Sequence, residues 1–153
     1  MSERKLSESD LGALFHTVLF AYQKTLRQTF GDTPSLMLTK FTIPIIEKIL
    51  DKASPELLKA NDVDVALQEF ADLIVASGFV RSAKITEDGE KRVLDLDECI
   101  FADHVHSMLN IDSDVTCPWA IIAISLARKF NSRDVKVALS KITSSGSKTS
   151  IEF

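Results

Sequence analysis

The residues of this sequence best suited to chemistry lie together in segment 97–119. This segment holds both cysteines of the chain, Cys99 and Cys117, and two of its three histidines, His104 and His106. Thiolate and imidazole are the side chains that zinc favours in proteins, and a thiol beside an imidazole is also the pair used in nucleophilic catalysis. The chain has no G-x-G-x-x-G motif and no P-loop, which leaves this segment as the most reactive part of the sequence.

One interpretation of the segment is a zinc site. In a helix covering its first part, Cys99, Asp103 and His106 would share one face, because they are offset by four and seven residues. Cys117 stands at the start of the next predicted helix, and a short loop would bring it towards His106. Cys99, His106 and Cys117 are therefore the expected zinc ligands, with Asp103 or water as the fourth. His104 lies one residue off this face and could replace His106.

Two other interpretations of the same residues remain open. The spacing C-x6-H-x10-C matches no common zinc motif, and cysteine is among the most buried residue types, so both cysteines could belong to the core. Cys117, His106 and Asp103 also have the residue types of a nucleophilic site. No signature motif surrounds them, however, so no catalytic residue is predicted and the sequence leans away from an enzyme.

The predicted elements are helices first and hairpins later. Apolar residues recur at steps of three and four over 11–30, and Ser7 with Asp10 resembles a capping pair before this helix. A second helix follows over 32–53, where Pro44 should kink or split it. A third is expected over 63–77, with Asp62 as its cap and Gly78 at its end.

Alternation of apolar and polar residues predicts a β-hairpin over 79–96, with Asp88-Gly89 as its turn. A helix capped by Asp97 is expected to run to about Leu109, and another is expected over 117–131, capped by Thr116. A second hairpin should have strands over 133–142 and 149–153 and a turn around Gly146. The predicted fold class is α+β, with N-terminal helices packed on a small antiparallel sheet built from two hairpins that flank a helix pair.

Composition restricts the class of protein. At 153 residues the chain suggests one domain, expected over 11–153 after a disordered or loosely ordered stretch over 1–10. The net charge of −4 argues against nucleic acid as a partner. The polar N-terminus does not resemble a signal peptide, and no apolar run reaches the ~18 residues of a membrane span. Two cysteines without a secretion signal indicate a cytoplasmic protein.

The order of these segments resembles a known family. The sequence FADLIVASGFVRSAKI, a hairpin, a helix beginning C-P-W, and VKVALSKITSSGSKTSIEF together resemble the 4-vinyl reductase, or hydrocarbon-binding, domain family. That family shares its fold with subunits of the transport protein particle that tethers vesicles. The resemblance runs from about Leu11 to Phe153. Its best local matches are Ser77-Gly78-Phe79 before a strand, Cys117-Pro118 at a helix start and Gly146 in the last turn.

The resemblance implies a domain that binds small apolar or aromatic molecules, often as a dimer. Metal-binding relatives place one cysteine in the helix that starts here with Cys117, and a carboxylate and two cysteines in the final hairpin. This sequence has no cysteine in that hairpin, and Glu152 is the only carboxylate near its end. The usual metal site of the family is therefore not carried over, and a zinc ion would need the other ligands named above.

Apolar residues are dense around Pro44, and a kinked helix over a sheet can enclose a ligand pocket. The expected lining residues are Phe15, Tyr22, Phe41, Phe101 and Trp119. The alternative is that these side chains fill the core, as residues at helical spacing commonly do. The surplus of apolar residues also predicts a homodimer. A dimeric scaffold with a vestigial pocket is the second functional hypothesis.

Overall fold

The computed structural model describes residues 7–53, 60–106, 115–130, 135–136 and 138–152. Its elements in chain order are α1 (Glu8–Phe30), α2 (Asp32–Ala53), α3 (Val63–Ala76), β1 (Ser82–Asp88), β2 (Lys91–Asp97), α4 (Ala102–Val105), α5 (Pro118–Phe130), β3 (Lys141–Ile142) and β4 (Ser147–Glu152). Helices dominate the first half and an antiparallel sheet the second. The predicted α+β fold class is confirmed.

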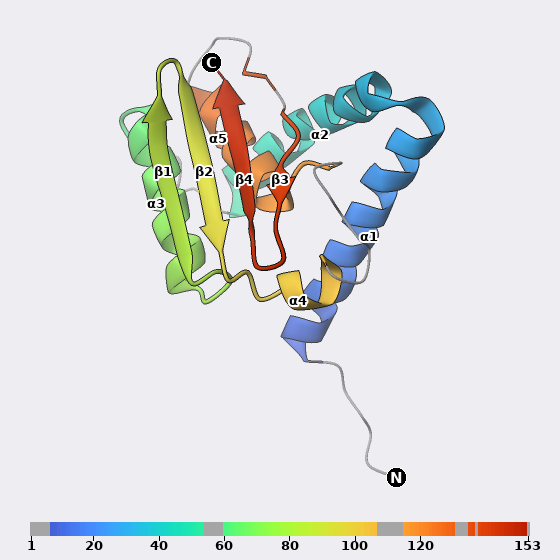
Figure 1. Cartoon of the computed structure of the whole chain (residues 1–153). Helices are drawn as coiled ribbons and strands as arrows, with labels where there is room; N and C mark the ends of the chain where they lie inside the picture. The colour runs from blue at the N-terminus through green and yellow to red at the C-terminus, as the bar shows by residue number, and fades with distance from the viewer. Residues whose placement is uncertain (1–6, 54–59, 107–114, 131–134, 137, 153) are drawn as a thin grey trace.

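The sheet has the strand order β1-β2-β4-β3, and every neighbouring pair is antiparallel. The two hairpins therefore join through β2 and β4, with Leu94 opposite Thr149. Helices α3 and α5 cover one face of the sheet (Figure 1). Leu94, Leu96 and Ile151 are buried on the covered side. This face of the sheet and its two helices form the centre of the core.

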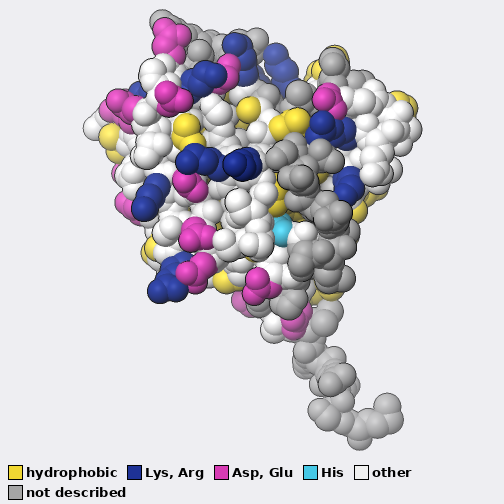
Figure 2. Space-filling model, in the orientation of Figure 1, with side chains coloured by type: hydrophobic (Ala, Val, Ile, Leu, Met, Phe, Trp, Pro, Cys, Tyr) yellow, Lys and Arg dark blue, Asp and Glu magenta, His cyan; other side chains and the backbone are white. Residues whose placement is uncertain are grey.

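The other face of the sheet is polar. Figure 2 shows basic and acidic side chains mixed over it, without a field of one sign. One of its pairs joins Lys148 Nζ to Asp95 at 3.1 Å, across β4 and β2. Exposed ion pairs of this kind contribute little to stability. This face therefore gives no indication of a charged partner.

The first two helices form a hairpin that extends beyond the sheet. Helix α1 ends at Gly31, whose φ of 83° lies in the left-handed region, and α2 then turns back towards α5 (Figure 1). Arg27 and Asp32 form an ion pair of 2.5 Å across this turn. Helix α2 continues through Pro44 without a break, so of the two expected effects of Pro44, a kink or a split, the split is wrong.

The capping pair predicted at the N-terminus is confirmed. Ser7 Oγ accepts a hydrogen bond from the Asp10 backbone N–H at 3.1 Å, and the Asp10 carboxylate accepts one from the Ser7 N–H at 3.0 Å. The helix consequently begins at Glu8, three residues earlier than predicted. Residues 8–10 belong to α1, and the rest of the predicted loose N-terminus, residues 1–6, lies outside the described residues.

Two predicted elements are shorter in the structure. Asp97 ends β2 instead of capping a helix, and α4 covers only Ala102–Val105 of the predicted 97–109, of which 107–114 lie outside the described residues. The predicted strand 133–142 is reduced to Lys141–Ile142 in the part of it that is described, apart from an isolated bridge between Lys136 and Glu152.

The short β3 has a physical reason. The backbone before β3 forms hydrogen bonds to the segment that precedes α5 instead of continuing along β4. Ser140 N–H donates to Val115 O at 2.8 Å, and Thr116 Oγ1 donates to Ala138 O at 2.9 Å. Because these backbone groups are already paired, they are not available to lengthen the sheet edge.

The last turn packs tightly against the end of β2. A Cβ atom added to Gly146 would lie 1.9 Å from the backbone oxygen of Leu96. The same turn is held by Ser145, whose hydroxyl donates to Asp97 at 2.7 Å and whose backbone oxygen accepts from Cys99 N–H at 2.8 Å. Gly146 is therefore required by the space available at this turn.

Candidate functional site

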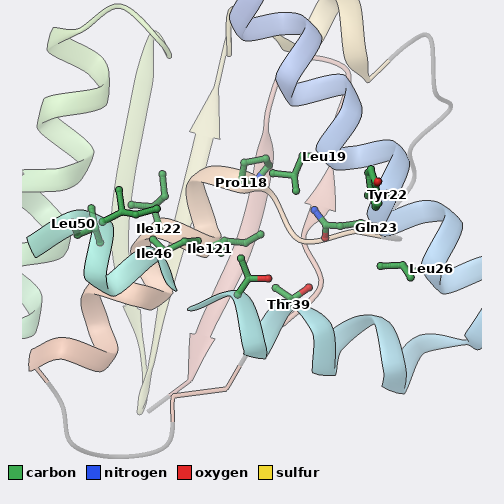
Figure 3. Close-up of a pocket in the computed structure, with 12 residues that line it drawn as sticks. Leu19, Tyr22, Gln23, Leu26, Thr39, Ile46, Leu50, Pro118, Ile121 and Ile122 are labelled. Carbon is green, nitrogen blue, oxygen red and sulfur yellow. The ribbon is translucent and has the colours of Figure 1, made fainter. Parts of the chain in front are cut away.

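A cavity of about 520 Å³ lies between α1, α2 and the first turns of α5 (Figure 3). Figure 3 shows side chains from these three helices converging on it. The lining is mainly aliphatic and contains no charged side chain. It consists of Leu19, Tyr22, Gln23, Leu26, Thr39, Thr42, Ile46, Ile49, Leu50, Pro118, Ile121 and Ile122. Two other pockets in the described part of the chain have Asp, Lys or Arg side chains in their walls, unlike this one.

Helical spacing explains how the three walls form. Leu19, Tyr22 and Leu26 recur at steps of three and four on α1, so they share one side of that helix. On α2, Ile49 and Leu50 follow Ile46 by three and four residues, so these three also share one side of their helix. Pro118, Ile121 and Ile122 supply the third wall from the N-terminal part of α5.

Gln23 is the polar residue that ties the cavity wall together. Its amide nitrogen donates to Thr116 O at 2.9 Å, and its amide oxygen accepts from Thr116 N–H at 2.8 Å. These two buried hydrogen bonds connect the middle of α1 to Thr116, two residues before the start of α5. Each end of the amide therefore has one protein partner.

Sequence reasoning missed Gln23, although a signal for it exists. His16, Phe20 and Gln23 recur at steps of four and three, and all three are buried. They form the inward face of α1, and the more hydrophobic face beside it is exposed. A glutamine in register with a histidine and a phenylalanine on one helical stripe indicates a buried, hydrogen-bonded amide.

The five predicted ligand-binding residues are found in three different places. Tyr22 lines the cavity, as expected. Phe15 and Phe41 are 74% and 65% exposed and are not among the lining residues, and their role in ligand binding stays a prediction. Phe101 and Trp119 come together, but in the interior and outside the cavity wall.

Phe101 and Trp119 belong to an aromatic cluster in which Phe101 is buried and Trp119 is half-buried. Their rings stack with centroids 6.4 Å apart, and Phe79 contacts Trp119 at 5.1 Å. His16 connects this cluster to α1, with ring centroids 5.0 Å from Phe101 and 4.8 Å from Phe20. For these two predicted residues the alternative of core packing therefore describes the structure better. Trp119 Nε1 is buried and has no hydrogen-bond partner among the described residues.

The residues proposed as zinc ligands have other contacts. Cys99 lies in the turn between β2 and α4 and not on a helix, so the helical face it was expected to share with Asp103 and His106 does not form. His106 Nδ1 lies 2.7 Å from Thr143 O, as expected for a ring N–H that donates to this carbonyl. No group of three or more His, Cys, Asp or Glu side chains within the described residues is placed to hold a metal ion. The zinc site with Cys99, His106 and Cys117 stays a prediction that these contacts do not support.

Cys117 is a buried thiol at the start of α5. Burial raises its pKa to about 11, although hydrogen bonds from Ser147 and from the backbone of Ala120 and Trp119 act in the opposite direction. Burial also lowers the pKa of His106. A thiol that keeps its proton at neutral pH is a poor nucleophile. This environment fits a core cysteine better than a catalytic one.

No helix among the described residues is long and apolar enough to cross a membrane. Comparisons of the chain with protein-family models, with curated proteins and with solved structures find no match.

Proposed function

We propose that this protein is a non-catalytic binding domain for a small apolar or aromatic molecule, of the hydrocarbon-binding type that its element order resembles. The observation that carries the proposal is the aliphatic cavity of about 520 Å³ between α1, α2 and α5. Small-molecule sites in proteins are typically concave and mostly apolar, with a few fixed polar groups and volumes of roughly 300–1,000 Å³. The cavity matches this description in size and in lining.

The lining restricts the chemical class of the ligand. It contains no Asp, Glu, Lys, Arg or His, so a charged group placed inside would lose its hydration without gaining a partner. The amide of Gln23 already forms one hydrogen bond at each end, both to Thr116. A neutral, largely hydrocarbon molecule fits these walls best.

The volume restricts the size of the ligand. An engineered apolar cavity of ~150 Å³ in another protein holds one benzene molecule. A cavity of about 520 Å³ therefore has room for a molecule of roughly two or three rings, or for a branched aliphatic chain of similar bulk.

The second hypothesis, a dimeric scaffold with a vestigial pocket, draws support from the exposed apolar side chains of α1 and α2. An open cavity of this size favours ligand binding over a filled pocket. The two hypotheses share the same exposed surface and differ in whether the cavity binds a molecule.

Titration with N-phenyl-1-naphthylamine tests the proposal, because this neutral three-ring amine fluoresces strongly in apolar surroundings. We expect saturable binding by the native protein. Ile46→Trp fills the α2 wall of the cavity, and we expect it to weaken binding at least tenfold. Leu73→Trp adds the same side chain at an exposed position on α3 outside the cavity, and we expect it to leave binding unchanged.

Thermal unfolding of both variants shows whether they remain folded, and the comparison is made only at temperatures where they are. Absence of saturable binding by the native protein would contradict the proposal. Equal binding by native protein and Ile46→Trp would place the dye elsewhere and contradict it as well.

A further inference from the structure

The most hydrophobic face of α1 is directed away from its own core. Six exposed large apolar side chains in the first four turns of this helix recur at steps of three and one: Leu11, Leu14, Phe15, Val18, Leu19 and Tyr22. The whole stretch 11–22 contains no charged residue. Interface centres are depleted in charge and enriched in aromatic residues, and this set, here called the α1 stripe, has both properties.

The α1 stripe is symmetric about its own midpoint, which lies between His16 and Thr17. Reversing the direction of the helix about that point exchanges Leu11 with Tyr22, Leu14 with Leu19, and Phe15 with Val18. A two-fold dimer requires a surface that complements itself in this way, because residue i of one copy meets residue j of the other and the reverse. A stripe that meets a different protein has no need of such symmetry.

The charges at the ends of the stripe also fit an antiparallel pair. Glu8 and Asp10 precede it, and Lys24 and Arg27 follow it. When two copies of α1 run in opposite directions, the acidic end of each lies beside the basic end of the other, which favours this orientation over the parallel one. The dipoles of the two helices are opposed in the same arrangement.

The available area is sufficient for a stable dimer. A second set of exposed apolar residues, Met37, Phe41, Ile45 and Ile49, recurs every four residues on α2. Tyr22 and Ile49 both line the cavity, so the two sets meet at its mouth. Ten such side chains, each exposing about half its surface, offer on the order of 1,000 Å², compared with ~800 Å² per partner in a standard interface and a few hundred Å² on a typical monomer.

We infer that a second copy of this chain packs its α1 antiparallel against the α1 stripe and thereby completes the wall of the cavity. Tyr22 is 68% exposed although it lines the cavity, so the wall there is open to solvent in a single chain. In the symmetric register, Leu11 of the second copy lies against Tyr22. The ligand would then be enclosed by two chains, and this last step rests on the proposed function.

Cysteine cross-linking tests the register. The double variant Leu11→Cys with Tyr22→Cys places the two new thiols of facing helices side by side, and we expect mild oxidation to convert it almost completely to a disulfide-linked dimer. In each single variant the matching thiols of the two copies are ~16 Å apart along the helix axis, from a rise of ~1.5 Å per residue, well beyond the ~7 Å limit on Cα separation in a disulfide. We expect no cross-link in either, and none in the native chain, whose two cysteines are buried.

Sedimentation velocity tests the dimer itself. We expect the native protein to be a dimer at micromolar concentration and Phe15→Glu to be a folded monomer, because the variant places a charge at the centre of the interface. Val65→Glu makes the same change at an exposed apolar position on α3, and we expect it to remain a dimer. A monomeric native protein, or single variants that cross-link as efficiently as the double variant, would overturn the inference.

Dye binding separates this inference from the proposed function. We expect monomeric Phe15→Glu to bind N-phenyl-1-naphthylamine several-fold more weakly than the native dimer, because Tyr22 then lacks its cover. Unchanged binding by the monomer would overturn the shared wall and leave the proposed function intact. A dimer with the expected cross-links and no dye binding would overturn the proposed function and support the symmetric pairing alone.

Discussion

Among the residues that line the cavity, Gln23 has the most specific structural role. It lies on the inward face of α1 and forms two hydrogen bonds, both to the backbone of Thr116. The amide therefore fixes the distance between α1 and the beginning of α5, which supplies the third wall of the cavity. Gln23 therefore positions α1 relative to α5, and its replacement should lower the free energy of unfolding.

Replacement of Gln23 by methionine keeps the approximate shape of the side chain and removes both hydrogen bonds. Thr116 N–H and C=O then remain buried without partners, so we expect a loss of about 2–4 kcal/mol in the free energy of unfolding. Urea denaturation of Gln23→Met measures this loss. The matched control is Gln28→Met at an exposed position of the same helix, which should change stability by less than ~0.5 kcal/mol. Similar effects of the two substitutions would contradict the role of Gln23.

His16 makes the stability of the fold depend on pH. Burial first, and the nearby His106 second, lower its pKa from 6.5 to about 4. Between these values the unfolded chain binds a proton that the folded chain does not. The contribution of His16 to the free energy of unfolding is therefore fully present above pH 6.5 and is lost as the pH falls towards 4. At pH 5 the free energy of unfolding is lower by about 2 kcal/mol because of this group.

The substitution His16→Phe tests this pH dependence, because a phenyl ring fits between Phe20 and Phe101 and cannot be protonated. Urea denaturation at pH 7.5 and pH 5 should show a smaller loss of stability for the variant than for the native protein. A residual loss is expected from His106, whose pKa is also lowered by burial. Equal losses in the two proteins would show that His16 is not the group that titrates.

At the scale of elements, the last turn is the most constrained connection. Gly146 does not have a positive φ, so its backbone conformation is open to alanine and only space is lacking. A Cβ atom there would lie 1.9 Å from Leu96 O and 3.0 Å from Asp97 Cα. These are backbone atoms of β2, which can move aside only if the pairing of β2 with β4 is disturbed.

We therefore expect Gly146→Ala to lower the free energy of unfolding by about 3 kcal/mol. Thermal unfolding measures the change. Ser144→Ala, at an exposed position of the same turn, is the control and should be nearly neutral. A Gly146→Ala protein as stable as the control would mean that the turn does not approach β2 as closely as described.

The elements differ in how far the sequence predicts them. Helix α1 and its Ser7–Asp10 cap follow from periodicity and capping rules, and the hairpin β1–β2 follows from alternation and Asp88-Gly89. The buried face of α1 does not follow, because the more hydrophobic stripe is exposed and the core receives His16, Phe20 and Gln23. Hydrophobicity favours burial of a face without specifying whether its own chain or another molecule covers it.

The short α4 and β3 show a second limit of prediction. Both are determined by hydrogen bonds between distant segments, such as Cys99 N–H to Ser145 O and Ser140 N–H to Val115 O. Periodicity reports the local chain only, so it extends both elements into residues whose backbone groups are paired elsewhere. The proposed zinc ligands depended on a longer helix at α4, and their predicted common face is lost with it.

At the scale of the whole molecule, the cavity follows from the position of the α1–α2 hairpin beyond the edge of the sheet. Helices α3 and α5 fill the core against the sheet, and α2 packs along α5, where Glu47 pairs with Arg128 near the end of that helix (Figure 1). Helix α1 is joined to the segment before α5 by the hydrogen bonds of Gln23 to Thr116. The sequence predicted an apolar pocket near α2 and one of its lining residues, Tyr22. The aliphatic majority of the lining was not predicted, because aromatic residues were expected to form the wall.

The central claim is that a neutral apolar molecule binds between α1, α2 and α5. Methyl NMR of isoleucine-labelled protein during titration with N-phenyl-1-naphthylamine tests it most directly, because isoleucines line the cavity and also lie far from it. We expect saturable shifts in the methyl signals of Ile46, Ile121 and Ile122, and none in those of Ile85 and Ile151 on the sheet. Unperturbed signals from Ile46, Ile121 and Ile122 at saturating dye would contradict the claim.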